Sequence, residues 1–140
     1  MYKIGYTQGV YDVFHIGHLN LLKKAKSMCT KLIVGVNDDA LVQAYKNKKT
    51  VIPVDERVEI VRAIRWVDEA HITTTLDKVE AYNRFKFDVI FIGDDWKGSE
   101  RWAKTEKEMA KFNVKVEYLP HTPGISSTML RTILGSEERQ

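Results

Sequence analysis

Five short runs of β-type residues alternate with segments of helical spacing, and this alternation restricts the fold more than any other feature of the chain. The runs cover residues 3–7, 31–36, 69–72, 88–92 and 114–119. Between and after them, apolar side chains recur every three or four residues, which is the spacing of an amphipathic helix. The positions that predict five helices are Leu19, Leu22 and Ala25; Val58, Val61 and Ile64; Val79, Tyr82 and Phe85; Trp102, Met109 and Phe112; and Met129, Ile133 and Leu134.

Strand–helix–strand units of this kind cross over with a right-handed sense, and their strands pair in parallel. The segments 32–36 and 89–92 are continuously apolar, as is typical of strands buried on both faces. We therefore predict a single α/β domain with a Rossmann-like fold, in which helices cover both faces of a five-stranded, mostly parallel sheet. The domain should cover residues 1–135, because Gly135 is a good helix stop, and leave residues 136–140 as a flexible tail.

Charge and cysteine content exclude several classes of protein. Twenty-two Lys and Arg against 19 Asp and Glu leave a net charge of +3, too little for the sequence-independent attraction of a dedicated nucleic-acid binder. Cys29 is the only cysteine, which excludes an internal disulfide and a cysteine-cluster zinc site. No secretory-type segment opens the chain, and the apolar runs are too short to cross a bilayer. We expect a cytoplasmic protein that binds neither nucleic acid nor membranes.

Ligands of such a sheet bind beyond the carboxyl ends of its strands, so the residues after each run are the candidates for a site. The first run is followed by Gly-Val-Tyr-Asp-Val-Phe-His-Ile-Gly-His at 9–18. His15 and His18 stand where a helix begins, beside free backbone N–H groups that favour phosphate, and Gly17 leaves room for an oxygen. Two other interpretations stay open. One is a packed histidine beside a surface histidine, and the other is a metal pair, for which Asp12 is the only nearby third ligand.

Three later strands are also followed by segments whose residues could bind a ligand or take part in a reaction. Residues 45–51 hold three lysines, which form either a solvated charged turn or a set of cations that bridges two phosphates. Residues 93–98 read Gly-Asp-Asp-Trp-Lys-Gly, which can be a turn with a packed tryptophan. Residues 124–128 read Gly-Ile-Ser-Ser-Thr, which offers helix N-caps or, taken together, a second phosphate cradle.

The string at 9–18 resembles the signature of the nucleotidyltransferase superfamily that includes the cytidylyltransferases, in which His-x-Gly-His follows the first strand. Class I aminoacyl-tRNA synthetases share that spelling, but the sequence lacks their Lys-Met-Ser-Lys-Ser-type loop. Further matches follow in family order: the lysines, the acidic and arginine-containing segments 55–57 and 65–69, and Gly-Ile-Ser at 124–126. The string at 93–98 is most similar to the glycerol-3-phosphate cytidylyltransferases.

This resemblance covers residues 3 to about 134 and implies an enzyme that transfers CMP from CTP to a small phosphorylated alcohol. The leading acceptor is glycerol 3-phosphate, which gives CDP-glycerol and pyrophosphate. The alternatives are phosphoethanolamine, phosphocholine or another phosphorylated polyol, the use of ATP, and a non-catalytic nucleotide-binding module. The resemblance also implies a homodimer and Mg²⁺ that accompanies the triphosphate, without a dedicated metal site.

The resemblance assigns site residues one by one. It implies catalytic roles for His15, His18 and Lys46, with Lys46 and Lys78 on the acceptor. A phosphomonoester is largely dianionic at neutral pH, so no general base is required. His121 stands where the family has an arginine, and it cannot supply an arginine's permanent bidentate charge. The residues assigned to the nucleotide are Gly9, Val10, Tyr11, Gly17, Lys48, Arg65, Asp94, His121, Thr122, Gly124, Ile125, Ser126, Ser127 and Thr128.

Overall fold

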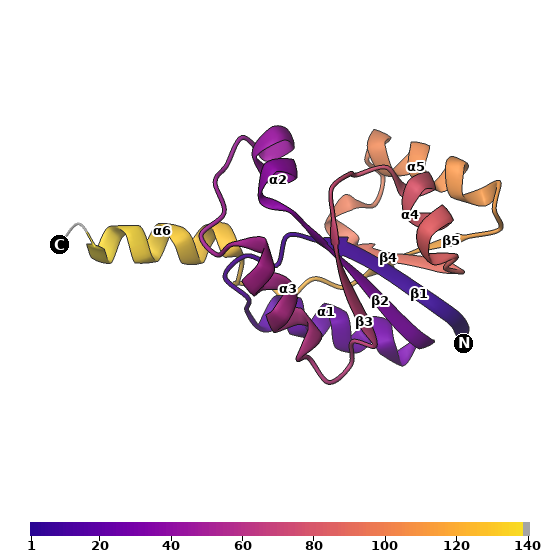
Figure 1. Ribbon diagram of the computed structural model, residues 1–140, viewed down its shortest axis with the longest axis horizontal. Coiled ribbons are helices and arrows are strands. Elements are labelled where there is room, and N and C mark those ends of the chain that lie inside the picture. Colours follow the sequence, from indigo (N-terminus) through magenta and orange to yellow (C-terminus); the bar gives the residue numbers. More distant parts are fainter. Residues whose placement is uncertain (139–140) are drawn as a thin grey trace.

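The computed structural model describes residues 1–138 and confirms the α/β alternation (Figure 1). The strands are β1 (Tyr2–Gly9), β2 (Cys29–Asn37), β3 (Glu69–Thr73), β4 (Val89–Gly93) and β5 (Lys115–Leu119). The helices are α1 (Ile16–Ser27), α2 (Asp39–Lys46), α3 (Val54–Arg62), α4 (Lys78–Phe85), α5 (Glu100–Ala110) and α6 (Ser127–Glu138), with a 3₁₀ turn, η1 (Asp94–Trp96), after β4.

The sheet has the strand order β3-β2-β1-β4-β5, and every described pair of neighbouring strands is parallel. The chain builds outward from β1 to β3 on one side, then crosses to β4 and β5 on the other. This reversal separates the connections that leave β1 and β4, and it opens a crevice beyond their carboxyl ends. The predicted Rossmann-like sheet is therefore confirmed, and it is fully parallel where only a mostly parallel one was expected.

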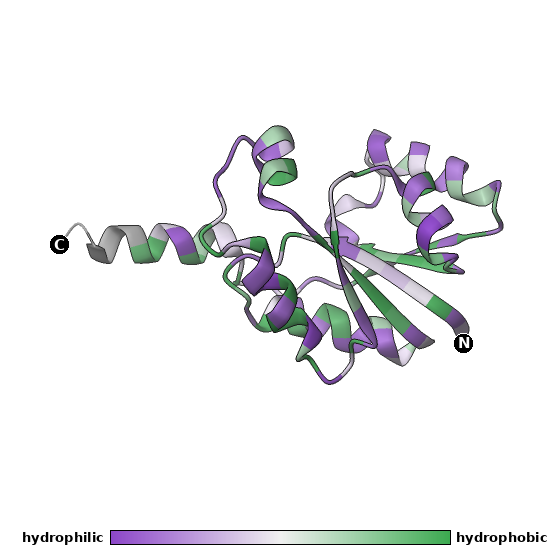
Figure 2. Ribbon diagram, in the orientation of Figure 1, coloured by the Kyte–Doolittle hydropathy of each residue, from purple (hydrophilic) through white to green (hydrophobic). Residues whose placement is uncertain are grey.

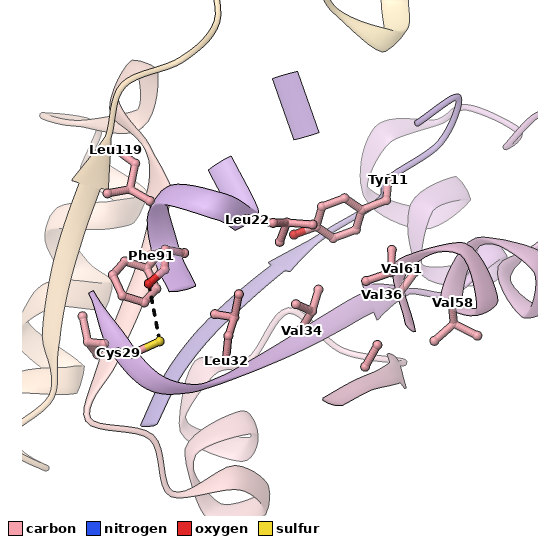
Figure 3. Packing of buried hydrophobic residues seen from close by; sticks show 13 residues of the cluster. Tyr11, Leu22, Cys29, Leu32, Val34, Val36, Val58, Val61, Phe91 and Leu119 are labelled. Atoms are coloured by element: carbon pink, nitrogen blue, oxygen red, sulfur yellow. Dashed lines mark hydrogen bonds between the residues drawn. The ribbon is translucent and has the colours of Figure 1, made fainter. Parts of the chain in front are cut away.

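Two apolar clusters bury the two faces of the sheet. On one face, Leu22 of α1 and Tyr11 face the row formed by Leu32, Val34 and Val36 of β2 (Figure 3). The other face packs against α4 and α5, which contribute Ala81, Trp102 and Met109. Burying one large aliphatic side chain of this kind contributes roughly 1.5–3 kcal/mol. Hydrophobic residues accordingly concentrate along β2 and β4, and hydrophilic residues lie on the outer sides of the helices (Figure 2).

Helix α2 was not predicted, and its last two residues, Tyr45 and Lys46, fall in the lysine segment 45–51 that was expected to be a loop. Only Val42 of its eight residues is buried, and none of them belongs to either apolar cluster. Its ends do carry helix signals. Asp38 caps the first turn by accepting from the Leu41 N–H at 2.8 Å, and Asn47 closes the last turn in the left-handed region at φ 52°.

The expected end of α6 at Gly135 is wrong, because the helix continues to Glu138. A glycine permits a left-handed stop but does not impose one, and the Ser-Glu-Glu that follows is compatible with a helix. The predicted tail 136–140 is thus helical as far as 138, and residues 139–140 lie outside the described part. Within the described chain, no helix combines the length and apolar character that a membrane crossing needs.

Candidate active site

Two histidines build the start of α1. The Nδ1 atom of His15, the N-cap residue, accepts from the Gly17 N–H at 3.0 Å, and Nδ1 of His18 accepts from the His15 N–H at 3.2 Å. The two rings stack with their centroids 3.9 Å apart. An Nδ1 that accepts a backbone N–H carries no proton, so each neutral ring keeps its proton on Nε2. The helix start therefore fixes the tautomer of both donors.

The surroundings keep both imidazoles uncharged at neutral pH. Burial lowers the pKa of His15, and burial together with the adjacent His15 lowers the pKa of His18 to about 4. The nearby Lys46 ammonium lowers the pKa of His18 further, whereas Asp12 opposes the shift. The Tyr11 side chain is 7% exposed and lies edge-on to His18, 5.4 Å between centroids, and the assignment of Tyr11 to the nucleotide stays a prediction.

Lys46 is the last residue of α2 and lines two cavities at once. The larger cavity, of about 330 Å³, opens beyond the carboxyl ends of β1 and β2 and is also lined by Lys78, Trp96, Arg101 and Trp102. The smaller cavity, of about 80 Å³, is formed by Lys48, Lys49, Thr50, Ser127, Thr128 and Arg131, together with Val10, Asp12 and Val42. Burial, followed by the neighbouring cations Lys48 and Arg131, lowers the pKa of Lys46.

Lys78 is held inside the larger cavity. Its ammonium donates to the Leu76 carbonyl at 3.0 Å and lies 5.8 Å from the centroid of the Trp102 ring. Burial, with a contribution from Arg101, lowers its pKa to about 8. The prediction that Lys46 and Lys78 share one site agrees with this geometry. Sequence reasoning did not identify Arg101, because no motif marks a residue in the first turn of an amphipathic helix.

Asp12 anchors the walls of the smaller cavity. It is 2% exposed, and its carboxylate accepts from the N–H groups of Val51 and Ile52 at 2.8 and 3.0 Å and from Arg131 at 3.1 Å. Ser127 adds a hydrogen bond from Oγ to the Asp12 carbonyl at 2.6 Å. The carboxylate is therefore committed to holding the lysine segment and α6 in place. Within residues 1–138, no group of three or more His, Cys, Asp or Glu side chains could hold a metal ion.

Arg57 is a fully buried clamp behind the site and was not identified as such from the sequence. Its guanidinium donates to the carbonyls of Ile52, Val10 and Asn37 at 2.7, 2.6 and 2.8 Å, and to the Asp39 carboxylate at 2.7 Å. It thereby ties the ends of β1 and β2 to the segments that carry the lysines. The desolvation cost of burying an arginine is offset only when its donors are satisfied in this way.

The β5–α6 loop packs against the start of α1. Thr122 Oγ1 accepts from Asn20 of α1 at 2.9 Å, and a side chain added at Gly17 would lie 3.5 Å from Ile125 and 2.8 Å from the His15 ring. Gly124 takes a left-handed φ of +80°, and Ser126 Oγ caps α6 by accepting from Met129 N–H at 3.0 Å. His121 Nδ1 pairs with Asp94 Oδ1 at 2.7 Å, which raises the pKa of His121. The structure thus brings these predicted nucleotide residues to the first helix.

Arg65 is not at this edge of the sheet. It is exposed in the turn between α3 and β3, and the flanking Trp66 lies under Lys23 at 5.3 Å, near the far end of α1. Since α3 runs from the carboxyl edge of the sheet back to the amino edge, the residues that follow it lie at the amino edge. The structure therefore does not bring Arg65 to the other residues predicted to hold the triphosphate, and its role stays a prediction. Arg131, which was not predicted, lines the smaller cavity.

The chain is similar to known proteins in both sequence and fold. A family model described as cytidylyltransferase-like matches residues 6–133. The glycerol-3-phosphate cytidylyltransferase of Bacillus spizizenii is 34% identical over 131 residues, which are 93% of this chain and 95% of that protein. The FAD synthase of Thermococcus kodakarensis is 37% identical over 115 residues, 81% of this chain and 76% of that protein. A lipopolysaccharide core biosynthesis protein from Thermoplasma volcanium shares the fold, with a TM-score of 0.72 at 24% identity, over 87% of this chain and 98% of that one.

Proposed function

Because the chain belongs to the cytidylyltransferase-like family and is a nucleotidyltransferase, we propose that it transfers CMP from CTP to a small phosphorylated alcohol. The proposed acceptor is glycerol 3-phosphate, and the products are CDP-glycerol and pyrophosphate. The observation that carries this proposal is the position of Lys46 between a small cationic cavity and a larger one with further cations. Two phosphate-bearing molecules can meet at such a lysine.

In the proposed reaction, an oxygen of the acceptor phosphate attacks the α-phosphorus of CTP. The new P–O bond forms as the bond to the bridging oxygen breaks, and that electron pair leaves with pyrophosphate. The obstacle is repulsion between two anions, which at about 4 Å and an effective dielectric constant of about 20 is on the order of 4 kcal/mol for each pair of unit charges. Lys46 between the phosphates offsets it, and the Nε2–H groups of His15 and His18 donate to the α-phosphate and the leaving oxygen.

The remaining residues position the nucleotide. Lys48, Arg131 and the start of α6 at Ser127 and Thr128 surround a space suited to the β- and γ-phosphates. The β5–α6 loop, with the paired His121 and Asp94, faces the nucleoside part. The proposal includes Mg²⁺ that arrives with the triphosphate, since this ion prefers phosphate oxygens and water. When bound, it would neutralise charge on the departing pyrophosphate.

A second candidate function is transfer of AMP from ATP to FMN, which yields FAD. It is favoured by relatives named FAD synthase in Thermococcus kodakarensis and Pyrococcus abyssi, at 37% and 35% identity. The chain covers 76–77% of these proteins but 95% of the Bacillus spizizenii glycerol-3-phosphate cytidylyltransferase. The fuller match supports glycerol 3-phosphate as the first proposal.

The test is a matrix of CTP and ATP against glycerol 3-phosphate, phosphoethanolamine, phosphocholine and FMN, with pyrophosphate release and product mass as readouts. Formation of CDP-glycerol as the fastest product supports the first proposal, and FAD formed only from ATP supports the second. Thermal stabilisation by CTP without pyrophosphate from any acceptor would instead indicate a non-catalytic nucleotide-binding module.

We also propose that the enzyme acts in the cytoplasm as a homodimer. Helix α6 projects from the body of the molecule (Figure 1), and its Ile133 and Leu134 side chains are 47% and 50% exposed. A second copy of the chain would cover such side chains. Light scattering coupled to size-exclusion chromatography should give twice the chain mass, and a monomer at all concentrations would contradict the dimer.

A further inference from the structure

The larger cavity contains three cations and no carboxylate. Lys46 comes from α2, Lys78 from α4 and Arg101 from α5, so positive charge reaches the cavity from three different elements. None of the residues that line the cavity is acidic. The field inside it therefore favours anions and opposes any ligand group with a positive charge.

Each of these cations also lies over an aromatic ring of the same cavity. The Lys46 ammonium is 5.7 Å from the centroid of Tyr45, the Lys78 ammonium is 5.8 Å from Trp102, and the Arg101 guanidinium is 5.8 Å from Trp96. Aromatic faces are what a protein uses to bind an ammonium or quaternary ammonium ligand. Here the chain's own cations already lie over these rings, so the rings are not free to bind a ligand's ammonium group.

Among these three cations, Arg101 is the one with the fewest other interactions to maintain. Lys46 faces both cavities, and Lys78 is bonded to the Leu76 carbonyl. Arg101 is exposed at the mouth of the cavity, and within residues 1–138 no carboxylate forms an ion pair with it. Its guanidinium keeps its charge at every working pH. An acceptor's non-reacting end would meet this charge on entering the cavity.

We infer that the larger cavity accepts phosphomonoesters without a cationic group, and that Arg101 sets this charge selectivity. The inference rests on the proposed function, which makes this cavity the acceptor site. Glycerol 3-phosphate, with only hydroxyl groups beyond its phosphate, satisfies the requirement. Phosphoethanolamine and phosphocholine each bring an ammonium group against Arg101 and are rejected by repulsion, which is an effective source of specificity.

The experiment compares kcat/KM for glycerol 3-phosphate and phosphoethanolamine, with CTP, in the wild type and three variants. Arg101→Glu reverses the charge and Arg101→Gln removes it. Lys107→Glu makes the same charge reversal elsewhere on α5, outside the cavity lining. The wild type should prefer glycerol 3-phosphate by at least about tenfold, and Arg101→Glu should change the ratio of the two acceptors by roughly 100-fold towards phosphoethanolamine. Arg101→Gln should fall between, and Lys107→Glu should keep the wild-type ratio.

A binding titration distinguishes failure of the charge-selectivity inference from failure of the proposed function. Trp96 and Trp102 line the cavity, so tryptophan fluorescence can follow the same acceptors without turnover. Equal use of both acceptors by the wild type, or the same ratio in Arg101→Glu and Lys107→Glu, would overturn the inference while the proposed function stands. Absence of pyrophosphate from every phosphomonoester would overturn the proposed function. In that case the titration decides: weaker binding of phosphoethanolamine that Arg101→Glu reverses supports the charge selectivity, and indifference to the substitution overturns it.

Discussion

The histidine pair at the start of α1 performs a structural and a chemical task with different ring atoms. Nδ1 of each ring accepts a backbone N–H, and the opposite nitrogen keeps the proton that can be donated to a phosphate. Since burial holds both rings neutral, in the proposed reaction they would stabilise developing negative charge as hydrogen-bond donors. The cationic part of that task falls to Lys46, whose charge is a smaller cause of the lowered pKa of His18.

Substitution of His18 can separate these tasks. In His18→Asn, the side-chain oxygen can replace Nδ1 as the acceptor, but nothing replaces the Nε2–H donor. In His18→Gln, the amide can reach the Nε2 position while the acceptor near the helix start is lost. We expect His18→Asn to keep the free energy of unfolding and to lower kcat by about 100-fold, since a transition-state donor is worth roughly 3 kcal/mol. We expect His18→Gln to retain more activity and to lose about 1 kcal/mol of the free energy of unfolding. Steady-state kinetics and urea unfolding measure both, and near-normal turnover of the Asn variant would refute the donor role.

The lowered pKa of His18 also predicts how stability depends on pH. The unfolded histidine takes up a proton near its ordinary pKa of 6.5, whereas the folded one does so only near 4. Between these values the unfolded state binds more protons, so the contribution is fully present above pH 6.5 and is lost as the pH falls towards 4. The slope from this residue is at most about 1.4 kcal/mol per pH unit. Urea unfolding across this range should show a smaller slope in His18→Asn, and identical slopes would contradict the assignment.

Several residues of the site were beyond the reach of sequence reasoning for one physical reason. Asp12 and Arg131 are 119 residues apart and meet only because α6 returns to the end of β1. Arg57 resembles a helix-surface arginine in the sequence, and its burial depends on carbonyls from three other segments. By contrast, His15 and His18 stand where a helix start was predicted after the first strand, and Lys46 was assigned by the resemblance to the family.

At the scale of elements, the site depends on how the segment between β2 and α3 is held. Arg57 bonds to the end of β1, the end of β2 and the start of α2. Asp12 holds the backbone of Val51 and Ile52 at the far side of the lysines. The lysines themselves therefore stay near the cavities without ion pairs of their own in the described chain.

Arg57→Met tests this clamp. The substitution keeps an apolar stem but leaves three carbonyls, of which that of Asn37 is buried, and the Asp39 carboxylate without their donor. We expect the free energy of unfolding to fall by about 3–5 kcal/mol, the range for breaking a buried charged network. Lys104→Met, at an exposed cation on α5, is the matched control and should change it by less than about 0.5 kcal/mol. Equal unfolding curves for the two variants would show that the clamp contributes nothing.

Helices and strands could be predicted from the sequence where packing against the core requires apolar residues at a regular spacing. All five strands were found, and the apolar runs of β2 and β4 are the most deeply buried. Helices α1, α3, α4 and α5 were found because each packs apolar side chains against a face of the sheet. Helix α2 contributes no residue to either apolar cluster and was missed. Helix α6 projects into solvent (Figure 1), so nothing in the core determines where it ends.

At the scale of the whole molecule, strand order creates the place where we propose that the substrates meet. β1 lies at the centre of the sheet, and the chain leaves its two neighbours, β2 and β4, towards opposite faces. Residues from α1, α2, α4, α5 and the β5–α6 loop then converge on one edge. No single element carries the site. The alternation of strands and helices therefore predicted the edge of the sheet at which the site lies, but it did not identify every residue that lines it.

The convergence of two cavities on Lys46 is the central claim, and Lys46→Met tests it most directly. The variant keeps an apolar stem of similar length and removes the ammonium, which lies 5.7 Å from the centroid of the Tyr45 ring. With CTP and glycerol 3-phosphate as substrates, kcat/KM for both should fall by at least about 100-fold, because the charge that relieves phosphate repulsion is lost. Unchanged kinetics for both substrates in the folded variant would remove Lys46 from the reaction and contradict the account.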